Sequence, residues 1–288
     1  MAANPLRHER SRFPVLLLGC VATLALAGLA LARNPNEREI KPAPNAQDVD
    51  EIYDKDGNPK ADSKIWVLDV KFKPLRSIKV NVPGRGEQVC YYLWYQVINK
   101  TAKPQLFVPN FELVTHDTRM VYRDEILPTV LDAIADLEDP SGVLKIKSSN
   151  SITRDPIPAS RPNAVPRAIT GVAIFTDPNE PLPRDSAAVK ERKAKMPKLS
   201  DSNFFSIFIG GLSNGWAETE AVGDSSKTVV RRKTLQLKFR RFGEGALRRD
   251  EDIRYIGHEW LYRASSLEVP KEKPRGGAKP EEKPPMMR

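Results

Sequence analysis

Stretches in which apolar and polar residues alternate run through most of residues 64–268, and this period of two predicts β-strands. The segments that follow the pattern, or that are apolar between turn residues, are 66–72, 78–82, 89–99, 106–108, 111–115, 168–175, 203–209, 229–242 and 253–262. Segment 89–99 is apolar or aromatic on both faces. We therefore expect it in the middle of a sheet that is covered on both sides.

Apolar residues return at helical spacing in one place only, between Pro128 and Asp139. Val130, Leu131, Ile134 and Leu137 mark one face, and proline at the first turn favours a helix start there. A second, short helix is expected at 187–195. So few helices cannot connect the strands of a parallel sheet. The pattern predicts a mainly β fold, an antiparallel β-sandwich of immunoglobulin-like architecture with one short helix.

The flanks of this region have a different composition. Residues 33–63 are polar, with proline, asparagine and aspartate throughout, and we expect a linker. Residues 269–288 are rich in proline, lysine and glutamate, which predicts a disordered tail. The folded domain should therefore occupy 64–268, although the charged stretch at 180–200 leaves open a division into two sandwich subdomains.

Residues 13–32 contain no charged residue, follow three arginines and end in Ala30-Leu31-Ala32. These features are typical of an export signal. Twenty helical residues at ~1.5 Å each would span about 30 Å, the thickness of a bilayer's apolar core. Residues 1–32 are thus a signal peptide cleaved near Ala32, or a signal anchor that stays as a transmembrane helix. In both cases the remainder is periplasmic or extracellular, because the basic residues stay in the cytoplasm.

The formal net charge is +9. Residues 1–32 hold three arginines and one glutamate, so the remainder keeps +7. This charge permits attraction to an anionic envelope polymer or another envelope protein, and nucleic acid is not expected outside the cytoplasm. The membrane itself is a partner through residues 13–32 if they are not cleaved. Of two cysteines, Cys20 lies in the export segment, so no internal disulfide is expected beyond it.

Basic residues are densest in the strand predicted at 229–242. Alternation should turn Leu235, Leu237 and Phe239 inward, and Thr234 and Gln236 outward with their basic neighbours. The candidate docking face comprises Arg231, Lys233, Lys238 and Arg240. The same charges would also suit an edge strand that avoids pairing with other chains.

Residues with catalytic potential do not form a recognisable motif. Cys90 lies within the most apolar strand, where a thiol is usually inert core. His116 and His258 stand 142 residues apart with no ligand spacing for zinc, so we expect no metal, no cofactor and no catalytic residue. A pair of carboxylates would be needed for sugar cleavage. The acidic candidates near strand ends are Glu112, Asp117, Asp124 and Glu259.

Four segments, YYLWYQVINKT, GVAIF, GLSNGW and RRKTLQLKF, resemble a group of uncharacterised exported bacterial proteins of β-sandwich type. The resemblance implies a place in the bacterial envelope, but that group has no assigned activity and supplies no site residue. We therefore expect a non-catalytic binding or scaffolding module of the cell envelope. The alternative is an extracytoplasmic hydrolase that cleaves carbohydrate or peptide with loop carboxylates, and a third hypothesis is an assembly subunit with an exposed apolar patch.

Overall fold

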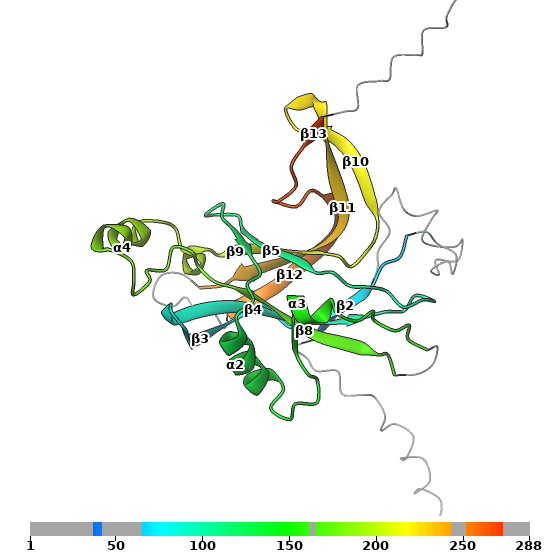
Figure 1. The fold of residues 1–288 in the computed structure, drawn as a ribbon, viewed down its shortest axis with the longest axis horizontal. Helices are drawn as coiled ribbons and strands as arrows, with labels where there is room; N and C mark the ends of the chain where they lie inside the picture. Colours follow the sequence, from blue (N-terminus) through cyan, green and yellow to red (C-terminus); the bar gives the residue numbers. More distant parts are fainter. Residues whose placement is uncertain (1–36, 42–64, 162–164, 244–251, 273–288) are drawn as a thin grey trace, which may run out of the picture. The chain divides into compact units, whose positions relative to one another are not determined.

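Two β-sheets make up most of the computed structural model, which describes residues 37–41, 65–161, 165–243 and 252–272 (Figure 1). The mainly β fold class is thereby confirmed. The predicted export segment at 13–32 and most of both flanks lie outside these residues. Within the described ranges, no helix combines the length and hydrophobicity needed to cross a bilayer.

The first sheet has six strands in the order β1-β2-β4-β8-β7, and β3 pairs with β4 as well. Its strands are β1 (Arg38–Ile40), β2 (Asp69–Phe72), β3 (Arg76–Val82), β4 (Gly86–Ile98), β7 (Lys147–Ser148) and β8 (Ala168–Phe175). All pairs are antiparallel except β7 with β8. Strand β1 comes from the segment expected to be a linker, and it adds to the sheet beside β2.

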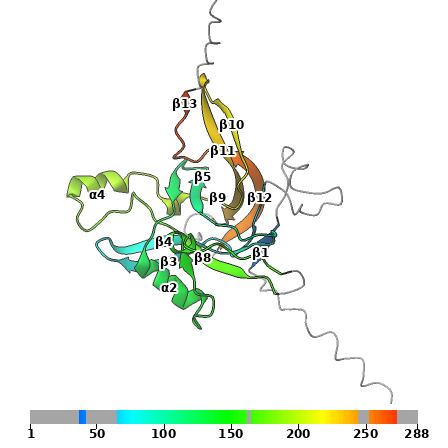
Figure 2. The ribbon, with the colours of Figure 1, turned by 45° about the vertical axis from the view of Figure 1, so that its right-hand side comes forward.

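The second sheet has seven strands in the order β10-β11-β9-β5-β6, with β12 and β13 also paired to β11. Its strands are β5 (Asn110–Thr115), β6 (Val121–Arg123), β9 (Phe204–Gly210), β10 (Trp216–Ala221), β11 (Asp224–Arg241), β12 (Ile253–Arg263) and β13 (Lys271–Glu272). All of these pairs are antiparallel. Strand β10 and the first half of β11 form a hairpin that extends away from the first sheet (Figures 1 and 2).

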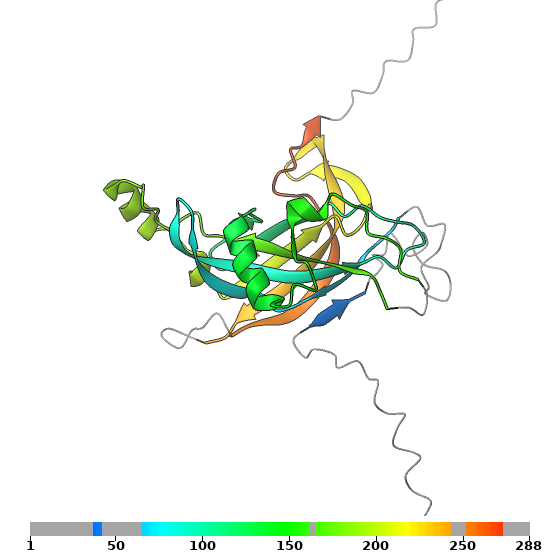
Figure 3. The same ribbon diagram turned by 60° about the horizontal axis from the view of Figure 1, so that its bottom comes forward.

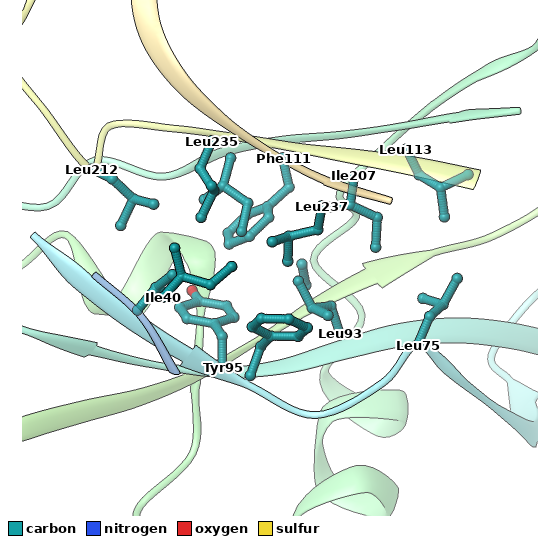
Figure 4. Packing of buried hydrophobic residues seen from close by; sticks show 14 of the residues in the cluster. Ile40, Leu75, Leu93, Tyr95, Phe111, Leu113, Ile207, Leu212, Leu235 and Leu237 are labelled. Atoms are coloured by element: carbon teal, nitrogen blue, oxygen red, sulfur yellow. The ribbon is translucent and has the colours of Figure 1, made fainter. Parts of the chain in front are cut away.

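One apolar core fills the space between the inner faces of the two sheets (Figure 4). Strand β4 contributes Tyr91, Leu93, Tyr95 and Val97, all buried, and β11 contributes Leu235, Leu237 and Phe239. Full burial of each such side chain stabilises the fold by roughly 1.5–3 kcal/mol. The inward direction predicted for the three β11 residues is confirmed, and the sheets are held together by this shared core.

The other face of β4 lies under helix α2 (Pro128–Glu138), which crosses the outside of the first sheet (Figure 3). Val130 and Ile134 pack against Cys90, Tyr92 and Trp94 in a second, smaller core. Strand β4 is therefore covered on both sides, as its sequence predicted. The remaining described helices are α3 (Ser149–Ile152), α4 (Ala187–Ala194) and a 3₁₀ turn at Leu199–Asp201.

The last turn of α2 is held by charge rather than by apolar packing. Leu137, expected on the buried face, is 59% exposed. Its neighbour Glu138 instead accepts hydrogen bonds from Lys73 at 2.8 Å, Arg76 at 2.6 Å and the Tyr92 hydroxyl at 2.7 Å. This carboxylate is almost completely buried. Three donors compensate for the loss of hydration, so the cluster fixes α2 on the sheet.

Segment 106–108 does not form the strand that its sequence suggested. Phe107 is buried in the main core, but Leu106 and Val108 are exposed, and only Gln105 makes an isolated bridge, to Ile157. The proline after Val108 has no N–H to donate to a neighbouring strand. Strands β1, β6, β7 and β13 were not predicted because two or three residues are too few to show a period, and β10 was not predicted because neither of its faces is apolar.

Gly211, directly after β9, lets segment 106–108 pass close to the second sheet. Its φ is +86°, and a Cβ on it would lie 2.0 Å from the carbonyl oxygen of Val108. Gly223, at the tip of the β10–β11 hairpin, has a similar φ of +84° but no atom within 4 Å of such a Cβ. The two glycines share the conformational requirement, and only Gly211 is also confined by a neighbouring segment.

We predict that Gly211→Ala lowers the free energy of unfolding by about 3–4 kcal/mol, because strain at positive φ adds to a backbone clash. Gly223→Ala should lower it by only about 1–2 kcal/mol, the cost of the φ angle alone. Urea unfolding followed by circular dichroism measures both. Equal losses in the two variants would contradict the close approach at Gly211.

Candidate functional site

The four predicted docking residues do not share one surface. Lys238 and Arg240 point outward from β11 and reach solvent, as predicted. Lys233 is completely buried, since it lies on the same side of the strand as Leu235 and Leu237, so it cannot belong to an exposed surface. Arg231 is half-buried and donates to the Thr219 hydroxyl at 2.7 Å. The structure thus keeps Lys238 and Arg240 as candidates.

These outward charges do not protect a sheet edge. Residues 235–240 of β11 pair with β9 on one side and with β12 on the other. Thr234 and Gln236 also lie on the outer face but are little exposed, and Gln236 donates to the Ser206 hydroxyl at 2.8 Å. Here β11 is a central strand whose outer face is packed and polar. Its charges therefore do not serve to keep a sheet edge from pairing with other chains.

Arg240 belongs to a basic and aromatic cluster on this outer face, which we call the Arg240 patch: Phe204, Arg240, Phe242 and Arg254. The Arg240 guanidinium lies 5.1 Å from the ring centres of both Phe204 and Phe242, and Arg254 lies 5.6 Å from that of Phe242. The two arginines are directly opposite each other on β11 and β12. Both rings are about two-fifths exposed.

Among the described residues, no carboxylate lies within ion-pair distance of Arg240 or Arg254. Lys238, two residues before Arg240, is paired with Glu259 at 3.0 Å. Stacking on aromatic rings restrains a guanidinium while its N–H groups can still bind an anion. The patch is thus an exposed, positively charged surface with restrained side chains.

The four candidate carboxylates are dispersed in the structure. Asp117 accepts hydrogen bonds from Ser202 and from the Asn203 amide, and Glu259 is exposed beside Lys238. Asp124 is partly buried and accepts a hydrogen bond from the Ile174 amide at 2.7 Å. Burial raises the pKa of Asp124 to about 6. Of these four, Glu112 alone lines the cleft described below.

A cleft of about 470 Å³ opens on the outer face of the second sheet, near the base of the β10–β11 hairpin. We call it the Glu112 cleft. It lies among strands β5, β9 and β11, segment 106–108 and the chain after β12. Nothing in the local sequence indicated it, because its walls come from segments up to about 200 residues apart in the chain, from Trp66 to Glu268.

The base of the cleft holds a buried ion pair. Glu112 is 1% exposed and pairs with Arg263, which lies 4.1 Å from the centre of the Phe208 ring. The carboxylate also accepts hydrogen bonds from the hydroxyls of Ser265 and Ser266, both at 2.7 Å. Burial raises the pKa of Glu112, but the hydrogen bonds from these serines and Arg263 outweigh it, so the pKa lies below its ordinary value. Glu112 is therefore a poor proton donor at neutral pH.

The cysteine and the two histidines considered as reactive residues are buried or hydrogen-bonded within the fold. Burial raises the pKa of the Cys90 thiol to about 11, which leaves it protonated and unreactive. His116 shares a hydrogen bond of 2.7 Å with Ser206, and His258 contacts the Tyr255 hydroxyl. In the described ranges, no three histidine, cysteine, aspartate or glutamate residues gather in a way that could hold a metal ion.

We predict that Asp124→Asn stabilises the protein at neutral pH. Because the folded-state pKa of Asp124 exceeds the unfolded value of 3.8, the folded state binds this proton more tightly, and wild-type stability falls as pH rises from about 4 to 6. The uncharged variant cannot titrate there. Its advantage should be near zero at pH 3 and reach about 3 kcal/mol at pH 7, from the size of the pKa change.

Urea unfolding of both proteins at several pH values tests this. Asp136→Asn serves as the control, since Asp136 is exposed on α2 and its charge stays hydrated in both states. A difference between Asp124→Asn and wild type that does not vary with pH would refute the raised pKa assigned to Asp124.

Comparison of the chain with family models, with curated proteins and with solved structures gives no match. A fold class alone does not define an activity, since one architecture can carry many functions. Function must therefore be argued from the two surfaces of the second sheet, the Arg240 patch and the Glu112 cleft.

Proposed function

We propose that the protein is a non-catalytic binding module of the bacterial cell envelope, which docks on an anionic envelope polymer through the Arg240 patch and Lys238. In this proposal residues 13–32 direct export, and the domain is a β-sandwich of immunoglobulin-like architecture. Two sheets that share one core support the sandwich. The uncharged segment that follows three arginines supports export.

The observation that carries the proposal is the pair Arg240 and Arg254, stacked on two exposed rings. Adjacent like charges repel each other when no anion is near, so bound phosphate or carboxylate groups relieve this repulsion. The stacked rings reduce the conformational entropy that the arginines lose on binding. The dispersed carboxylates, in turn, favour binding over the hydrolase alternative, because no two of the four share the described cleft.

Export is tested by fractionation and intact-protein mass. We expect the native protein in the membrane fraction with residues 1–32 retained, or outside the cytoplasmic membrane at the mass of residues 33–288. The physical reason is the bilayer-length apolar segment behind basic residues. A native protein that is soluble in the cytosol and still begins at residue 1 would contradict the proposal.

Docking is tested by charge reversal. The double variant Arg240→Glu/Arg254→Glu should bind immobilised poly(glycerol phosphate) with an affinity about tenfold or more below that of wild type, because attraction becomes repulsion. Wild-type binding should also weaken as salt screens the charges. Arg184→Glu/Arg192→Glu makes the same change in net charge at exposed positions outside the patch.

The control variant should keep wild-type affinity, and neutral dextran should bind none of the proteins. Equal losses in both double variants would show that net charge, and not the patch, is responsible. Unchanged binding of Arg240→Glu/Arg254→Glu would refute docking through this surface.

A further inference from the structure

Among the residues that the structure describes, one positive charge of the Glu112 cleft has no acidic partner. Arg263 is neutralised by Glu112, but Arg232, directly opposite Arg263 across β11 and β12, also lines the cleft and is exposed. In the described part of the chain, no acidic group lies within ion-pair distance of the Arg232 guanidinium. Glu268 on the rim would repel a second negative charge. A ligand with a single anionic group fits this arrangement best.

Part of the cleft lining is apolar. Leu106 is 47% exposed, Val108 55% and Leu267 61%, and the partly buried Trp66 joins them around the same cleft. Isolated exposed apolar residues are common, but here they gather from three separate segments around one hollow. Covering them would release water from apolar surface and favour binding. Tryptophan and arginine are also the side chains that most often dominate binding energy at protein interfaces.

The shape of the cleft sets the size of its ligand. Gly210 and Gly211 line it without side chains, and the tight passage of Val108 over Gly211 holds one wall in place. A volume of about 470 Å³ lies within the ~300–1,000 Å³ of small-molecule sites. It admits one or two side chains and their backbone rather than a folded surface.

Polar groups in the lining favour a peptide over a fatty acid as the ligand of the cleft. Asn110, Ser213 and Thr234 line the same cleft as the apolar residues. Each of these side chains makes one hydrogen bond within the protein, to Ser265, from the Gly215 amide and to the Arg232 carbonyl respectively, and keeps further donor or acceptor sites. A fatty-acid tail would remove water from those remaining sites without replacing its hydrogen bonds, which costs free energy. A peptide backbone supplies both N–H donors and C=O acceptors to them.

We propose that the Glu112 cleft binds the carboxyl terminus of a polypeptide whose last side chain is large and apolar. Arg232 pairs with the terminal carboxylate, and the last side chain lies among Trp66, Leu106, Val108 and Leu267. This site is separate from the Arg240 patch, so the protein would hold a polymer and a protein partner on the same sheet.

The test uses the full-length protein and the peptide acetyl-Gly-Ser-Gly-Leu-Phe, labelled for fluorescence anisotropy. The peptide with a free carboxylate should bind, and the same peptide with a terminal amide should bind about tenfold more weakly, as expected for one lost charged contact. Arg232→Gln should weaken binding of the acid by a similar factor and leave binding of the amide unchanged.

Arg231→Gln is the matched control, since Arg231 is the adjacent arginine on the opposite face of β11. It should keep wild-type affinity, as should Arg232→Lys to within a few-fold, because lysine preserves the charge. Arg240→Glu/Arg254→Glu should also bind the peptide normally, which separates failure of this site from failure of the docking patch.

Four results would overturn the proposal. The first is equal affinity for acid and amide, and the second is an equal loss in Arg231→Gln and Arg232→Gln. The third is competition by decanoate as strong as that of the unlabelled peptide, which would identify a fatty-acid site instead. Absence of acid binding at millimolar concentration would overturn it as well, provided that the melting temperature shows a folded protein.

Discussion

The apolar core between the two sheets is the constraint on which the rest of the structure depends. Leu93 and Tyr95 of β4 meet Leu235 and Leu237 of β11 with almost no exposure to solvent. Because strand side chains alternate between faces, fixing these residues inward also fixes which residues point outward. This packing decides which charged residues lie on the outer face of the second sheet. Arg240 points outward because its neighbour Phe239 points into the core.

Several charged residues near the core hold the chain together. Glu138 fixes the end of α2, and Glu112 joins β5 to the segment after β12. Arg241 is buried and donates to the carbonyl oxygens of Ser200 and Ser202 at 2.6 and 2.8 Å. The two proposed binding surfaces use basic groups on the outer face of the second sheet instead, Arg232 in the cleft and Arg240 with Arg254 in the patch. Both surfaces stand on paired strands, which favours binding without rearrangement.

Much of the secondary structure could be predicted from local pattern. Strand β8 spans the expected residues 168–175, α2 ends at Glu138 directly before the expected stop at Asp139, and both faces of β4 are buried as predicted. Such features depend on the spacing of apolar residues, which the sequence carries directly. The strand predicted at 106–108 was wrong, because three apolar residues fit a strand pattern although no neighbouring strand pairs with them. Lys233 could have been assigned correctly, since alternation with Leu235 already places it inside.

By itself, the sequence determined the β class, the strongest strands, the outward direction of Lys238 and Arg240, and an expected export segment at 13–32. Only the tertiary structure decided which distant side chains meet. The stacking of Arg240 with Arg254 and the Glu112 cleft require particular strand registers across β5, β9, β11 and β12. Register follows from the summed packing of both sheets, and a shift by one residue would turn every side chain to the opposite face. No local stretch of sequence holds that information.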